Sequence, residues 1–155
     1  MKSRVDILEI EPNSYKAMLA LEKYLATTQL KQNHKDLIKI RASQMNGCAF
    51  CLDMHTKEAL KNGETNQRIF LLNAWRETDL FTSEEKVLLA ITEEITLIHS
   101  QGLTDETYEK AEQAFDKNYI AQIIMAAVII NAWNRILIST NKTVEANMVT
   151  ASEPG

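Results

Sequence analysis

Residues that interrupt helices are scarce in this chain. Its 155 residues include only four glycines and two prolines, and the prolines, Pro12 and Pro154, stand near the two ends. Proline removes a backbone donor and clashes inside a helix, so the interior of the chain lacks the strongest helix breaker. With 45% hydrophobic and 25% charged residues, the chain has an ordinary globular composition and enough length to bury one core. These features predict an all-α, single-domain helical bundle.

Basic clusters are also missing. The formal charge is −4, and no stripe or block of lysine and arginine occurs. Nucleic-acid binders carry such a basic footprint, and an acidic surface is repelled by anionic membranes. We therefore expect no nucleic-acid partner and no membrane partner.

One apolar stretch, residues 119–138, is long enough to raise the question of a membrane span. It contains Gln122, Asn131, Asn134 and Arg135. Their polar groups would lack water or a partner in lipid, which argues against a span. The stretch is instead expected to form a core or subunit-interface helix.

The N-terminal residues lack the apolar segment and small-residue cleavage site of a secretory signal, and they carry Asp6, Glu9 and Glu11. We expect a cytoplasmic protein. Reductants keep ordinary thiols reduced there, so a cysteine pair is more typical of catalysis or metal binding than of a structural disulfide.

Caps and apolar spacing predict about six to seven helices in a domain over residues 1–140, followed by a flexible tail over 141–155. The expected helices run from Asn13 or Ser14 to Thr27, from Asn33 to Met45, from Cys48 to Gly63, from Gln67 to Glu77, from Thr82 to Gly102, from Thr104 or Asp105 to Phe115, and onward from Asp116 or Asn118. In the fourth of these, Phe70, Leu71, Ala74 and Trp75 are expected to face inward. Thr82 and Glu85 have the spacing of a capping box.

The two cysteines of the chain, Cys48 and Cys51, lie in one short segment with His55. Each residue of an α-helix turns the chain by about 100°, so these three side chains would share one face. A Cys-x-x-Cys pair can close a disulfide across one turn, and a helix N-terminus stabilises a thiolate. An imidazole one turn beyond Cys51 can take its proton. The spacing therefore predicts a thiol redox site.

A catalytic base needs a group that orients it, and Asp36 on the preceding helix is the candidate partner of His55. The Asn46–Gly47 corner would fold that helix back alongside the cysteine helix. Metal binding is the rival interpretation, because Cys48, Cys51 and His55 are acceptable zinc ligands. Structural zinc needs four ligands, and His34 and His99 would have to converge from other helices. Haem attachment requires a histidine directly after the second cysteine, where this chain has Leu52. We expect no cofactor and no metal.

Beyond the spacing of these residues, the amino-acid sequence itself resembles the core of the alkylhydroperoxidase D-like proteins of the carboxymuconolactone decarboxylase-like family. The resemblance lies in the run Asp36–Cys48, in Cys51, Asp53, Met54 and His55, and in the segments Asn73–Glu77 and Asn131–Arg135. It covers roughly residues 15 to 140.

This resemblance implies an all-helical fold that assembles into trimers or hexamers, and a peroxidase that cycles its cysteines between dithiol and disulfide. Carried over by position, Cys51 would attack the peroxide, Cys48 would resolve the sulfenic acid, and His55 would serve the proton relay. Two positions depart from the family pattern. Asp36 stands where the family has a glutamate twelve residues before the first cysteine, and Phe50 stands where some members have a second histidine.

The leading hypothesis is thus a thiol peroxidase that reduces hydrogen peroxide or organic hydroperoxides, with an external dithiol as electron donor. A dithiol reductant or adaptor for another peroxidase needs the same motif. A non-enzymatic redox sensor or a zinc-stabilised oligomeric module is the alternative from another class. Lactone decarboxylation, the reaction that names the family, gives no reason for a cysteine pair.

Overall fold

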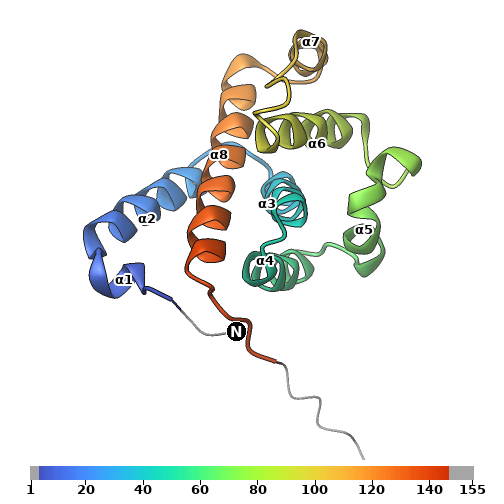
Figure 1. Ribbon diagram of the computed structural model, residues 1–155. Coiled ribbons are helices and arrows are strands. Elements are labelled where there is room, and N and C mark those ends of the chain that lie inside the picture. The colour runs from blue at the N-terminus through green and yellow to red at the C-terminus, as the bar shows by residue number, and fades with distance from the viewer. Residues whose placement is uncertain (1–3, 147–155) are drawn as a thin grey trace, which may run out of the picture.

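The computed structural model describes residues 4–146, and every regular element in that range is helical (Figure 1). The elements are α1 (Ile7–Ile10), α2 (Pro12–Ala26), α3 (Gln32–Asn46), α4 (Ala49–Lys61), α5 (Asn66–Leu71), the 3₁₀ helix η1 (Leu72–Glu77), α6 (Ser83–Thr96), α7 (Asp105–Ala114) and α8 (Lys117–Ser139). The all-α class is therefore confirmed, with more helices than the sequence predicted. The expected tail includes residues 147–155, which lie outside the described range.

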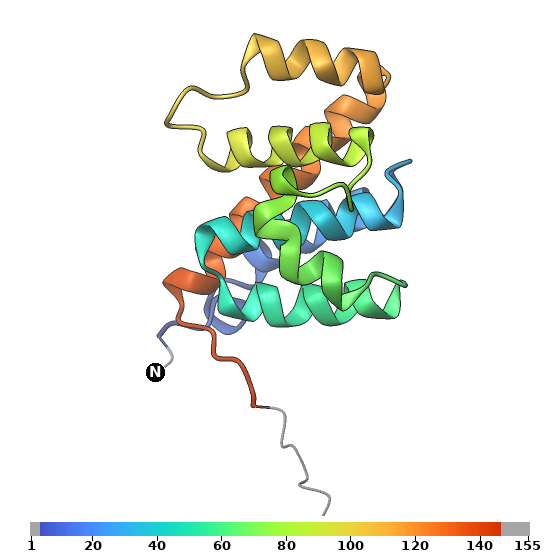
Figure 2. The ribbon, with the colours of Figure 1, turned by 90° about the vertical axis from the view of Figure 1, so that its right-hand side faces the viewer.

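Helices α3 and α8 form the centre of the core. Helix α3 packs against α8, α4 and α6, and Figure 2 shows α4, α3 and α6 stacked as successive layers. Leu37, Ile38 and Ile40 of α3 are fully buried. Because these helices and η1 all contact α3, the short loops at its two ends are held in place by the core.

Helix α8 is the one helix of residues 4–146 that is long and apolar enough to cross a membrane. Half of its most apolar segment is nevertheless buried inside the protein. Ile123, Ile129 and Ile130 belong to the core, while Gln122 and Asn134 are buried with hydrogen-bond partners. The expectation of a core helix is confirmed.

Side-chain caps decide several helix starts. Thr82 and Glu85 form the predicted capping box of α6, and Thr104 and Asp116 cap α7 and α8 through the backbone N–H groups of Thr107 and Tyr119. The start predicted at Asn33 is wrong. That side chain donates instead to Glu85 Oε1 at 3.1 Å.

The segment predicted as one helix over residues 67–77 is divided into α5 and η1, with non-helical dihedral angles at Ala74. The expected inward face is wrong at Phe70, Leu71 and Ala74, since Phe70 is 74% exposed and the other two are also exposed. The residues that turn inward are Ile69, Leu72 and Trp75. Their spacing of three residues is the period of a 3₁₀ helix, which the α-helical spacing could not anticipate.

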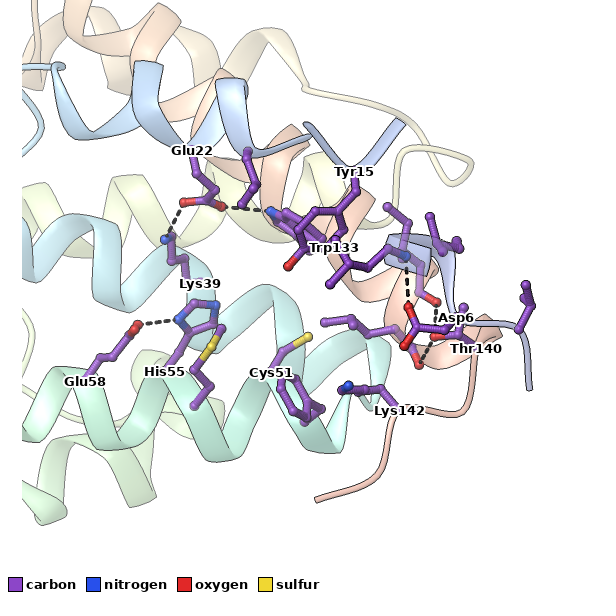
Figure 3. Close-up of a pocket in the computed structure, with 18 residues that line it drawn as sticks. Asp6, Tyr15, Glu22, Lys39, Cys51, His55, Glu58, Trp133, Thr140 and Lys142 are labelled. Carbon is purple, nitrogen blue, oxygen red and sulfur yellow. Dashed lines mark hydrogen bonds and ion pairs between the residues drawn. The ribbon is translucent and has the colours of Figure 1, made fainter. Parts of the chain in front are cut away.

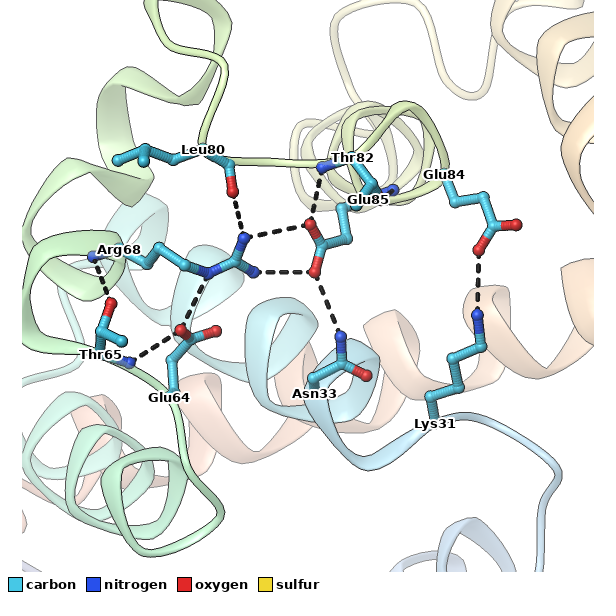
Figure 4. A network of polar contacts seen from close by, with 9 residues as sticks. All are labelled: Lys31, Asn33, Glu64, Thr65, Arg68, Leu80, Thr82, Glu84 and Glu85. Carbon is cyan, nitrogen blue, oxygen red and sulfur yellow. Dashed lines mark hydrogen bonds and ion pairs between the residues drawn. The ribbon is translucent and has the colours of Figure 1, made fainter.

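A buried ionic network ties α5 to α6 (Figure 4). The guanidinium of Arg68 donates to Glu85 Oε1 at 2.8 Å and to Glu64 Oε1 at 2.9 Å, and it also donates to the carbonyl of Leu80. Burial alone would raise the pKa of Glu85, but hydrogen bonds from Arg68 and from the backbone of Thr82 outweigh it and lower that pKa. The network therefore holds Glu85 as a carboxylate at the junction of α3, α5 and α6.

Candidate active site

The cysteine pair lies at the turn between α3 and α4. Gly47 ends α3 with φ of +69°, a left-handed conformation that favours glycine. Cys48 follows as the N-cap of α4, and its sulfur accepts a hydrogen bond from the backbone N–H of Cys51 at 3.4 Å. The two sulfur atoms form a disulfide, with the Cα atoms 5.4 Å apart. This is the bond across one helical turn that the spacing predicts.

A cavity of about 410 Å³ lies beside the disulfide (Figure 3). Phe50, Cys51, Met54, His55 and Glu58 line it from α4, whereas Cys48 is not among its lining residues. Both cysteines are almost fully buried, at 1% and 0% exposure. The two sulfurs thus differ in position, because only Cys51 borders the cavity.

His55 lies at the cavity wall with 6% of its surface exposed. Its Nδ1 and Glu58 Oε2 are 2.8 Å apart. A carboxylate only accepts hydrogen bonds, so Nδ1 carries the proton and Nε2 is left as the acceptor. Figure 3 shows Glu58 and Cys51 on opposite sides of the His55 ring, and Nε2 is the ring nitrogen that does not pair with Glu58.

The charge state of His55 follows from its surroundings. Burial lowers its pKa below the ordinary value of 6.5, and the positive charge of Lys39 lowers it further. Glu58 and Glu22 oppose this shift without cancelling it. His55 is therefore a neutral imidazole at neutral pH, the form that can take a proton from a thiol.

Asp36 is buried on α3, but it does not contact His55. Its two oxygens accept hydrogen bonds from Gln32 Nε2 and Asn62 Nδ2, each at 2.9 Å. The expected pairing of Asp36 with His55 is not formed, because Asp36 pairs instead with Asn62 at the C-terminal end of α4. Lys39, one turn further along the same side of α3, is the α3 residue that lines the cavity.

The cavity wall also contains five polar or aromatic residues that were not predicted to belong to the site: Tyr15, Glu22, Lys39, Glu58 and Trp133. Lys39 Nζ and Glu22 Oε2 are 3.0 Å apart, and Trp133 Nε1 donates to Glu22 Oε1 at 3.0 Å. The ring of Tyr15 packs edge-on against Trp133 at 5.6 Å between centroids. Glu58 could have been found from its position one turn after His55, but the pair of Glu22 and Trp133 spans 111 residues and only the fold joins them.

The rest of the cavity wall is largely apolar. Leu19, Ile136 and Leu137 contribute from α2 and α8, and the segment from Val5 to Leu8 closes one side. Arg4 holds this segment against the end of α8, since its backbone N–H donates to the carbonyl of Thr140 at 3.1 Å. An apolar cavity with a few convergent polar groups is typical of a small-molecule site.

Within residues 4–146, no group of three or more histidine, cysteine, aspartate or glutamate side chains is arranged to hold a metal ion. His34, one of the residues considered for a zinc site, has its Nδ1 2.8 Å from the hydroxyl of Tyr119. The polar side chains around Cys51 pair with one another instead.

Comparisons with known proteins identify the family of this chain. Residues 12–94 match the model of the carboxymuconolactone decarboxylase family. The uncharacterized protein YdfG of Bacillus subtilis is 45% identical over 139 residues, which cover 90% of this chain and 95% of that protein.

Two solved structures give the same result for the fold. A protein of unknown function from Agrobacterium tumefaciens, described as a candidate antioxidant defence protein AhpD, is 36% identical with a TM-score of 0.91, covering 94% of this chain and 100% of that one. An uncharacterized peroxidase-related protein from Silicibacter sp. TM1040 is 20% identical with a TM-score of 0.77, over 88% of this chain and 72% of that one, and shows the fold alone. The chain belongs to the carboxymuconolactone decarboxylase family and is structurally close to its AhpD-like members.

Proposed function

We propose that this protein is a thiol peroxidase that reduces hydrogen peroxide or organic hydroperoxides through Cys51 and Cys48. The observation that carries the proposal is the difference between the two sulfurs, since Cys51 borders the cavity with His55 while Cys48 lies behind it. An attacking sulfur needs access to substrate and a nearby base, and a resolving sulfur needs only to reach the attacking one.

The cycle begins with the reduced pair. His55 Nε2 accepts the proton of Cys51, and the thiolate attacks one peroxide oxygen. The O–O bond breaks, Cys51 becomes a sulfenic acid, and the departing alkoxide or hydroxide takes the proton back from His55. Cys48 then attacks the sulfenic sulfur, which forms the disulfide and releases water. An external dithiol donates two electrons and two protons to restore both thiols.

The polar groups around His55 support its role in this cycle. The hydrogen bond to Glu58 holds the proton on Nδ1 and leaves Nε2 as the nitrogen that can accept a proton. Burial and Lys39 keep the pKa of His55 low, so the imidazolium formed after proton transfer is a ready donor to the alkoxide. The name of the Agrobacterium protein, which refers to antioxidant defence, points to the same class of reaction.

The test is peroxide-dependent consumption of a small dithiol by the wild type, Cys51→Ser, Cys48→Ser and His55→Ala. We expect Cys51→Ser to be inactive and Cys48→Ser to stop after one peroxide with Cys51 as sulfenic acid, detected by mass spectrometry after trapping. His55→Ala should be slower by about 10²-fold or more, the scale for losing an acid–base group. Full turnover by Cys51→Ser, or dithiol consumption that does not depend on peroxide, would contradict the proposal.

A further inference from the structure

Six side chains with carboxylate, ammonium or imidazole groups border the cavity. These are Asp6 before α1, Glu22 on α2, Lys39 on α3, His55 and Glu58 on α4, and Lys142 after α8. Tyr15 adds a phenol. Two of the six are cations, and they differ in burial, since the side chain of Lys39 is only 16% exposed whereas Lys142 is exposed and faces the ring of Phe50 at 6.0 Å. Lys39 is therefore the less exposed of the two positive charges of this wall.

The contacts of Lys39 hold its ammonium group in place without fully neutralising its positive charge. Within residues 4–146 it forms an ion pair with Glu22, which also accepts the hydrogen bond of Trp133. Figure 3 shows the ammonium group on the wall opposite α4, above the ring of His55 and in the same cavity as Cys51. A charge that is largely removed from bulk solvent is screened less than an exposed one.

We propose that Lys39 is a positioning residue whose ammonium group stabilises the thiolate of Cys51 in the reduced protein, and that Glu22 limits this effect by sharing the charge. The inference deepens the proposed function and rests on Cys51 being the attacking thiol. In the disulfide the sulfurs carry no charge, and Glu22 is the counter-ion of Lys39. After reduction, loss of the Cys51 proton to His55 or to water creates an anion in the same cavity as this ammonium group.

The effect of Lys39 on His55 supports this assignment. After burial, Lys39 is the largest influence that lowers the pKa of His55, so its charge reaches the helix that carries Cys51. A cation lowers the pKa of a thiol as well as that of an imidazolium. Lys39 would therefore promote both the thiolate and the return of the proton from His55 to the departing alkoxide.

The experiment measures the pKa of Cys51 directly and needs no peroxide. Alkylation rates with iodoacetamide against pH are recorded on the reduced full chain in a Cys48→Ser background, where Cys51 is the one thiol. Lys39→Met should raise the apparent pKa of Cys51 by about one unit, the lower end of the effect of an adjacent opposite charge. Glu22→Gln keeps an acceptor for Trp133 but removes the competing anion, so it should lower that pKa.

Two control variants test whether the shift in the pKa of Cys51 depends on the position of the Lys39 charge, and not on the net charge of the protein or on its folding. Lys39→Arg keeps the cation and should retain the wild-type pKa. Lys35→Met removes the same charge one turn earlier on α3, outside the cavity lining, and should shift the pKa much less. An unchanged pKa in Lys39→Met, or an equal shift in Lys35→Met, would overturn the inference. A shifted pKa in a protein that does not reduce peroxides would leave the inference standing and remove the proposed function.

Discussion

Glu58 Oε2 lies 2.8 Å from His55 Nδ1, and both residues belong to α4, one turn apart. The side chain of Glu58 is 52% exposed, so the pair is partly screened by water. Its main effect is to fix which nitrogen of the ring carries the proton. His55 is therefore paired with a residue of its own helix, α4, and not with Asp36 of α3 as expected.

Replacing Glu58 with Gln should slow peroxide reduction by about 3- to 10-fold, because the amide oxygen still accepts from Nδ1 but no longer stabilises the imidazolium. Steady-state rates at pH 7 give the measurement. Asp53→Asn is the matched control, since Asp53 lies on the same helix and pairs with Lys57 rather than with His55. Equal rates in wild type and Glu58→Gln would remove Glu58 from the relay.

Asp36→Asn tests the residue that stands at the family glutamate position. Both carboxylate oxygens accept hydrogen bonds from amide groups, so one of them would face a second donor after the change. We expect the free energy of unfolding to fall by about 1–3 kcal/mol, while activity per folded molecule is retained. Urea unfolding and peroxide assays on the same preparation decide this. Reduced activity at unchanged stability would return Asp36 to the proton relay.

The oxidised protein should lose stability as the pH falls below about 6.5, the ordinary pKa of histidine. Burial, as the largest cause, lowers the pKa of both His34 and His55. The unfolded chain therefore binds more protons than the folded one once the pH drops below 6.5, and the free energy of unfolding decreases until the folded histidines are protonated too.

Glu85 and Glu93 have lowered pKa values, because hydrogen bonds from Arg68, Trp75 and their neighbours outweigh burial. Their stabilising contribution is lost only below about 4.5, the ordinary pKa of glutamate. Urea unfolding at pH 7.5, 6.5 and 5.5 thus isolates the histidines, and His55→Gln should reduce the slope. A free energy of unfolding that stays constant or rises between pH 6.5 and 5.5 would refute this.

Oligomerisation, which the family resemblance implies, remains a prediction. Trp75 and most of the stretch Ile123–Ile130 are buried in the core of a single chain, although Val128 is 45% exposed. The large apolar side chains left on the surface include Phe70 at 74% and Ile98 at 59%. We expect light scattering to show three or six chains of 17.6 kDa, and Phe70→Glu to lower the mass. A monomeric wild type at micromolar concentration would contradict the prediction.

Some features of this protein depend on neighbours along the chain, and the sequence alone was sufficient for them. The all-α class follows from the scarcity of glycine and proline together with helix caps and apolar spacing, and the shared face of Cys48, Cys51 and His55 follows from the turn of a single helix. The capping box of Thr82 and Glu85 has the same local origin. Each involves residues at most seven positions apart.

Other features were decided by the tertiary structure, because they depend on distances between helices that no local spacing encodes. The choice of Lys39 over Asp36 at the cavity wall depends on how α3 is rotated against α4. The inward turn of Leu72 depends on the 3₁₀ geometry of η1. The hydrogen bond between Trp133 and Glu22 joins α8 to α2 across 111 residues. It forms because the packing of the core brings two side chains together that would be far apart in the unfolded chain.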